Sequence, residues 1–167
     1  PFKTLGTKNW QDNMETHLKS TYLLCLKAAP LMKQQGEGRI INFSDWIAAS
    51  ARPRYKEYLP YYVSKMGIIG LTEALALELA PEILVNTIAP GTMKTPIMES
   101  VGEEAIAKFA ANIPFPKRLG APDEYADAAA FLLTNTYVNG EVMRLDGAQR
   151  FTVCLSASIC FSISVLV

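Results

Sequence analysis

Three short apolar runs, separated by helix-like stretches, constrain the fold of this chain more than any other feature. We interpret the runs as strands at 38–43, 83–88 and 141–146, and the stretches around them as helices at 8–34, 60–80, 102–111 and 122–134. Strands that alternate with helices are typical of a parallel sheet covered by helices. The sequence therefore predicts an α/β fold, and no internal repeat or low-complexity linker interrupts it up to Arg150.

Composition and charge exclude several classes of function. The 167 residues suit one domain, and 50% of them are apolar, which is enough to build a core. Sixteen basic and sixteen acidic residues cancel without a basic run, so we expect neither a nucleic acid nor a membrane as partner. Cys25, Cys154 and Cys160 form no C-x-x-C pair, which argues against a disulfide framework or a zinc site. No signal-peptide pattern is present, so we expect a cytoplasmic location.

A Tyr and a Lys stand one helical turn apart at the start of the helix predicted at 60–80. Tyr61 and Lys65 share a helix face, because residues four apart lie above one another. A phenol has a pKa of about 10, and a neighbouring ammonium favours the phenolate, so we expect Lys65 to lower the pKa of Tyr61. A Tyr with such a pKa can give or take a proton near neutral pH.

The surroundings of this pair carry a family resemblance. Pro60 suits the first turn of a helix, and the strand at 83–88 is followed by a Pro90-Gly91 turn. Strand, helix with Tyr-x-x-x-Lys, strand and Pro-Gly turn, in this order, resemble the short-chain dehydrogenase/reductase family. The resemblance runs from about Pro1 to Arg150, with further matches at 117–124 and 140–148. It implies a partial doubly wound, Rossmann-like sheet.

One part of the family pattern is missing from the sequence. Neither G-x-x-x-G-x-G nor G-x-G-x-x-G follows a strand here, although such glycines hold the cofactor pyrophosphate at a helix N-terminus in the family. Residues 1–150 therefore look like the C-terminal portion of the family's domain. The resemblance implies that the intact protein is an NAD(P)-dependent oxidoreductase, with NADP favoured, and we expect residues 1–167 alone to be inactive.

The resemblance also implies roles for named residues. The Tyr of the family's Tyr-x-x-x-Lys motif is the general acid/base, which points to Tyr61 rather than to Tyr62. The Lys, here Lys65, bonds the nicotinamide ribose hydroxyls and lowers the pKa of the Tyr. The segment that covers the nicotinamide corresponds to Pro90, Gly91, Met93 and Thr95.

Asp45 departs from the family pattern. Alignment of Asn42-Phe43-Ser44-Asp45 with the usual Asn-x-Ser-Ser puts Asp45 in the place of the catalytic Ser, and the loop from Trp46 to Pro60 looks a few residues long. An ionised carboxylate cannot donate to a substrate carbonyl, but it can accept from N–H groups, and it can donate if burial raises its pKa. An Asp here resembles the pteridine reductase branch, which reduces a C=N bond. A small carbonyl substrate, with Ser44 in the usual role, is the alternative.

His17, the only His, is the second departure. It stands where the family commonly has the Asn of Asn-x-x-Gly, and that Asn holds a water in a proton relay to the Lys. An imidazole can do similar work, because its ring nitrogens donate and accept. The alternative is a His that packs on its helix and has no catalytic role.

Residues 151–167 form an apolar tail that has no counterpart in the family. From Leu155 to Val165 apolar residues alternate with Ser, apart from Cys160, as in a half-buried strand. The alternative is translated non-coding or frame-shifted sequence. The helices at 8–34 and 60–80 correspond to those of the family's dimer and tetramer contacts, so we expect a homo-oligomer. A non-enzymatic remnant that acts as an association module is the alternative to the enzyme.

Overall fold

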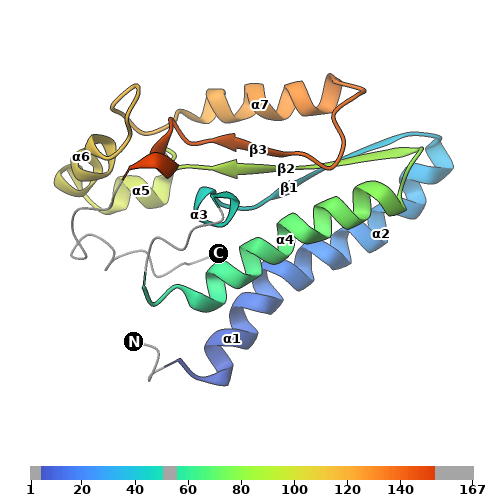
Figure 1. Ribbon diagram of the computed structural model, residues 1–167, viewed down its shortest axis with the longest axis horizontal. Coiled ribbons are helices and arrows are strands. Elements are labelled where there is room, and N and C mark those ends of the chain that lie inside the picture. Colours follow the sequence, from blue (N-terminus) through green and yellow to red (C-terminus); the bar gives the residue numbers. More distant parts are fainter. Residues whose placement is uncertain (1–4, 51–55, 153–167) are drawn as a thin grey trace.

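The computed structural model describes residues 5–50 and 56–152. Its centre is a parallel sheet of three strands in the order β1-β2-β3. The strands are β1 (Gly38–Phe43), β2 (Ile83–Pro90) and β3 (Val142–Leu145). Figure 1 shows helix α7 on one face of this sheet and helices α2 and α4 on the other. The predicted partial parallel sheet covered by helices is confirmed, and each strand lies within two residues of its predicted bounds.

Most of the helices also agree with the sequence patterns. The helices are α1 (Thr7–Asn13), the π-helix η2 (Met14–Lys19), α2 (Ser20–Gln35), α3 (Trp46–Ala49), α4 (Leu59–Glu78), α5 (Pro96–Ser100), α6 (Glu103–Ala111), α7 (Pro122–Thr134) and the 3-10 turn η3 (Gln149–Phe151). The prediction of one regular helix at 8–34 is wrong in its middle, where the π-helix widens the turn. The prediction of a loop from Trp46 also misses α3, because a single helical turn leaves no periodic pattern to detect.

The core packs helices α2 and α4 onto the central strand. Ile83 and Val85 of β2 are fully buried and contact Ala29 of α2 and Ala76 of α4. Burying one such branched side chain contributes about 1.5–3 kcal/mol. The small alanines let both helices come close to the sheet, and this fixes the position of α4 relative to β1 and β2.

The buried face of α4 also sets the position of the Tyr and Lys. Every fourth residue of this helix is buried, namely Pro60, Ser64, Ile68, Thr72 and Ala76. Tyr61 and Lys65 each follow a buried residue by one position, so they lie beside the buried stripe and not on the solvent side. From there both side chains reach the end of β1.

Three further sequence predictions concern the cysteines, the tail and the membrane. Cys25 is buried and has a free thiol, whereas Cys154, Cys160 and the alternating tail lie outside the described residues. In the described part of the chain, no helix combines the length and the apolar character needed to cross a bilayer. β1 pairs only with β2 among the described strands, so it forms one edge of this sheet.

Candidate active site

The candidate residues gather where the parallel strands end. β1 is followed by Ser44 and Asp45, β2 by Gly91, and β3 by Asp146. The carboxyl ends of parallel strands lie at one edge of a sheet, and this is the edge at which open α/β sheets bind ligands. Residues from distant parts of the chain therefore meet here.

A direct hydrogen bond joins Asp45 to Tyr61. The Tyr61 Oη donates to Asp45 Oδ2 at 2.7 Å, while the other carboxylate oxygen accepts from the Ile47 backbone N–H at 2.9 Å. The second bond makes Asp45 the N-cap of α3, which satisfies an otherwise unpaired donor of that short helix. Asp45 thus ties α3 to the first turn of α4.

This contact changes the expected acidity of Tyr61. Burial raises the pKa of Tyr61 above its ordinary 10.0, and the charge of Asp45 and the bond to it raise it further. The predicted lowering of the Tyr61 pKa is therefore wrong for this structure. The phenol donates its proton to a carboxylate, and such a bond favours the neutral phenol. Burial also raises the pKa of Asp45, against the opposing effects of the Tyr61 bond, the Ile47 bond and Lys65.

Lys65 lies between the Tyr61 ring and the end of β1. Its Nζ is 5.6 Å from the centroid of the Tyr61 ring and donates to the Phe43 carbonyl at 3.2 Å. The predicted placement of both side chains on one face, one turn apart, is confirmed. Burial lowers the pKa of Lys65, and the nearby charge of Asp45 acts in the opposite direction.

His17 contacts Tyr61 from the π-helix. The two rings meet edge to face, with centroids 5.3 Å apart and planes at 87°. Burial and, to a smaller extent, the charge of Lys65 lower the pKa of His17. π-Helical turns occur frequently at functional sites. His17, Asp45, Tyr61 and Lys65 form what we call the acid/base cluster.

Three other residues near the cluster differ in their contacts. The Ser44 hydroxyl is buried and donates to the Lys65 carbonyl at 2.9 Å, so it faces the backbone of α4. The ring of Tyr58 lies 6.4 Å from that of Tyr61, a neighbour that sequence reasoning missed although it precedes Tyr61 by three residues. Tyr62 is partly buried.

The residues predicted to cover the nicotinamide lie in one segment at the same edge, Pro90–Thr95, which begins with the last residue of β2. A Cβ on Gly91 would lie 2.7 Å from the Asp146 Cα, so the close approach that this glycine permits is to the chain after β3. Met93 forms a bridge with Gly120, and the Thr95 hydroxyl caps α5 by accepting from the Met98 N–H at 3.3 Å.

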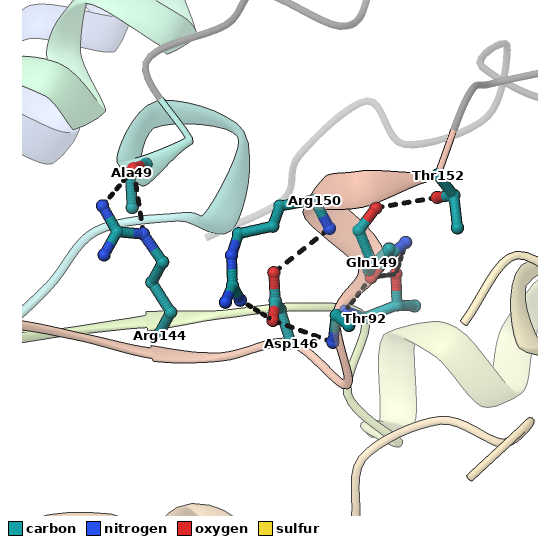
Figure 2. Close-up of polar contacts among 8 residues, drawn as sticks. Ala49, Thr92, Arg144, Asp146, Gln149, Arg150 and Thr152 are labelled. Atoms are coloured by element: carbon teal, nitrogen blue, oxygen red, sulfur yellow. Dashed lines mark hydrogen bonds and ion pairs between the residues drawn. The ribbon is translucent and has the colours of Figure 1, made fainter. Parts of the chain in front are cut away.

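The residues after β3 hold this loop in place. Gln149 is buried; its Oε1 accepts from the Thr92 N–H at 3.0 Å and its Nε2 donates to the Thr92 hydroxyl at 3.0 Å (Figure 2). The Asp146 carboxylate pairs with Arg150 Nη1 at 2.6 Å. We call residues 146–152 the C-terminal turn. Within the described residues, no group of three potential ligands could hold a metal ion.

Comparison with known proteins identifies the family to which this arrangement belongs. The family model described as enoyl-(acyl carrier protein) reductase matches residues 1–148. The chain belongs to the short-chain dehydrogenase/reductase family. Among the members of this family, human 3-hydroxyacyl-CoA dehydrogenase type-2 is 48% identical over 91 residues, which are 54% of this chain and 35% of that protein.

Solved structures of short-chain dehydrogenases/reductases have the same fold. 3-Hydroxyacyl-CoA dehydrogenase type-2 from Mycobacterium avium is 52% identical, with a TM-score of 0.80 over 88% of this chain and 58% of that one. A variant of actinorhodin polyketide ketoreductase, solved with NADPH, is 28% identical, with a TM-score of 0.81 over 90% of this chain and 62% of that one. The chain spans less than two thirds of the length of each of these relatives.

Proposed function

We propose that the protein to which this chain belongs is an NAD(P)-dependent oxidoreductase in which Tyr61 exchanges a proton with the substrate. The observation that carries the proposal is the bond of 2.7 Å between Tyr61 Oη and Asp45 Oδ2, with Lys65 and His17 next to the phenol ring. Clusters of titratable groups with displaced pKa values in a partly buried site are candidates for catalysis. The relatives named above are all oxidoreductases by name, so the association module is not favoured.

The donor groups of this edge fit the nicotinamide end of a dinucleotide. The Lys65 ammonium has three N–H donors, one of which bonds the Phe43 carbonyl, so it can also donate to ribose hydroxyls. The Pro90–Thr95 loop would lie over the nicotinamide. When bound, the cofactor supplies the hydride. The NADPH in the polyketide ketoreductase supports NADP as the dinucleotide.

The chain's own residues would control the proton. Tyr61 is held neutral by burial and by its bond to Asp45, so it enters a reduction with the proton that the substrate needs. That proton is engaged by Asp45 and must be redirected to the substrate atom. Its raised pKa lets Asp45 take up a proton more readily than an exposed carboxylate does, and once protonated it can donate to Tyr61 or to the substrate and so release the phenol proton. Lys65 then stabilises the phenolate that remains.

We propose a 3-oxoacyl or 3-hydroxyacyl thioester as the substrate, because the M. avium and human relatives are named for 3-hydroxyacyl-CoA. The second candidate is a pterin-like C=N compound, and the specific observation in its favour is Asp45 beside Tyr61, since a carboxylate accepts from ring N–H groups. Ser44 is the weaker candidate for orienting a carbonyl, because its hydroxyl bonds the Lys65 carbonyl. A homo-oligomer and a cytoplasmic location remain predictions.

An assay of the intact protein tests both substrate classes. Oxidation of NADPH and NADH is followed with acetoacetyl-CoA and with dihydrobiopterin, for the wild type and for Asp45→Ser. We expect thioester reduction that Asp45→Ser preserves or improves, and any pterin reduction to fall in the same variant. Equal losses on both substrates would make Asp45 structural, and no loss on either would move the role to Ser44. Absence of cofactor oxidation with every substrate would contradict the proposed function.

A further inference from the structure

Arg144 of β3 makes a contact at this edge that neither the acid/base cluster nor the C-terminal turn includes. Its Nε and Nη2 donate to the Ala49 carbonyl at 3.0 and 2.6 Å (Figure 2). Ala49 is buried and is the last residue of α3, 95 positions before Arg144. A guanidinium offers two N–H groups in one plane, so it holds a single carbonyl oxygen from a fixed direction. The contact therefore joins β3 to the end of α3.

Helix α3 depends on contacts of this kind for its position. It has four residues, so its last carbonyls have no partner within the helix, and one turn is too short to be stable by itself. Asp45 caps its first turn, and Arg144 bonds its last carbonyl, where the helix dipole favours a cation. The two ends of α3 are thus held by an acidic and a basic residue from different parts of the chain.

A shift of α3 would move the acid/base cluster. Asp45 is the N-cap of α3, and its second carboxylate oxygen accepts from Tyr61 Oη at 2.7 Å. Any rotation or translation of this single turn therefore changes the direction in which Asp45 meets the phenol. Catalytic rates are sensitive to displacements of this kind, and misplacement by about 1 Å can cost about 100-fold.

We propose that Arg144 is a positioning residue, which holds Ala49 and so sets the contact between Asp45 and Tyr61. The inference rests on the proposed function, since it assigns Arg144 to the reaction through Asp45. Arg150 is the contrasting arginine nearby: its partner Asp146 lies four residues before it, so it stabilises its own turn.

The experiment compares three variants of the intact protein. Arg144→Met removes the donors to Ala49, and Arg144→Lys keeps one cation that can reach the same carbonyl. Arg39→Met is the matched control, because Arg39 Nη1 donates to the Gly38 carbonyl at 2.8 Å at the opposite end of the sheet. We expect Arg144→Met to lower kcat about tenfold with the cofactor KM unchanged, Arg144→Lys to recover most of the loss, and Arg39→Met to stay within about twofold.

A double-variant comparison tests whether the effect passes through Asp45. If Arg144 acts by holding α3, Arg144→Met should lower kcat further by less than about twofold in a protein that already carries Asp45→Ala. Equal losses with and without Asp45 would overturn the proposal, and so would an unchanged kcat in Arg144→Met. If Tyr61→Phe keeps its activity, the proposed function fails instead, and the two failures are therefore distinguishable.

A second readout does not depend on activity. The His17 ring packs edge to face on Tyr61, so the ring-proton NMR signals of His17, assigned by their loss in His17→Asn, report the position of the phenol. We expect Arg144→Met and Asp45→Ala to shift these signals, and Arg39→Met to leave them in place. Signals that stay unmoved in Arg144→Met would overturn the positioning role even in an inactive protein.

Discussion

Two carboxyl groups follow strands of the same sheet, Asp45 after β1 and Asp146 after β3, and their partners differ in charge. Asp45 accepts from a neutral phenol and one backbone N–H. Asp146 is buried and accepts from the guanidinium of Arg150 at 2.6 Å and from the backbone N–H groups of Ala148 and Arg150 at 3.1 and 3.2 Å. The guanidinium of Arg150 balances the charge of Asp146, whereas Asp45 accepts from neutral donors and burial raises its pKa.

This difference indicates that, at one edge of the sheet, the acid/base cluster has a catalytic role and the C-terminal turn has a structural one. The acid/base cluster holds groups whose pKa values burial has displaced, namely His17, Asp45, Tyr61 and Lys65. The C-terminal turn compensates its charges internally and uses Gln149 to fix Thr92 in the Pro90–Thr95 loop. We therefore expect substitutions in the cluster to change turnover and its pH dependence, and substitutions in the turn to change stability.

The largest expected effect is that of Tyr61→Phe on turnover. The substitution removes only the phenol oxygen, so kcat of the intact protein should fall about 100- to 10,000-fold, the range for loss of a general acid or base. Tyr62→Phe is the matched control and should keep most of the activity. Steady-state assays and circular dichroism on both variants check this. Near-full activity in Tyr61→Phe with loss in Tyr62→Phe would show that the Tyr-Lys register is wrong.

A loss of stability is expected where the Pro90–Thr95 loop packs against the C-terminal turn. A methyl group at Gly91 would lie 2.7 Å from the Asp146 backbone, so Gly91→Ala should cost about 1–3 kcal/mol of unfolding free energy. Gly70→Ala is the control, because a Cβ at this exposed position of α4 would meet no atom within 4 Å outside its chain neighbours and the helix's own backbone. That variant should gain up to about 1 kcal/mol. Urea unfolding measures both, and a Gly91→Ala protein as stable as wild type would contradict the close packing of the turn.

The regular helices and strands could be predicted from the sequence, but the contacts between short elements could not. The three strands and α4 carry long apolar patterns, so their bounds and the shared face of Tyr61 and Lys65 could be predicted. The direction of the Tyr61 pKa shift could not be predicted, because it depends on Asp45, which lies 16 residues before Tyr61 and meets it only in the folded chain. Arg144 and Ala49 are 95 residues apart, and no local pattern connects them.

Substitution of each aspartate by asparagine should change the stability of the protein in opposite directions. The folded state raises the pKa of Asp45 above the ordinary 3.8, so wild type loses stability as the pH rises from that value through the folded pKa. Asn does not titrate and still caps α3. The stability of Asp45→Asn, measured relative to wild type, should therefore increase as the pH rises from acid values. Asp146→Asn breaks the pair with Arg150 and should cost about 1.5–3 kcal/mol at neutral pH. If Asp45→Asn does not gain stability relative to wild type as the pH rises, or if Asp146→Asn costs nothing at neutral pH, the distinction between the cluster and the turn is lost.

The smallest expected effect concerns His17 and again appears only with pH. Burial and Lys65 hold the pKa of His17 below the ordinary 6.5, so the folded protein binds this proton less readily than the unfolded chain. The contribution of His17 to the free energy of unfolding is therefore fully present above pH 6.5, and it is lost as the pH falls through the pKa of His17 in the folded state. His17→Asn has no such proton to bind, so its thermal midpoint should fall less than that of wild type upon acidification. The midpoint difference between the two proteins, followed from neutral pH downward, isolates this one imidazole from the carboxylates that titrate in both. A constant difference across that range would mean that His17 is not held uncharged by its place beside Tyr61 and Lys65, and the cluster would then lose one of its four members.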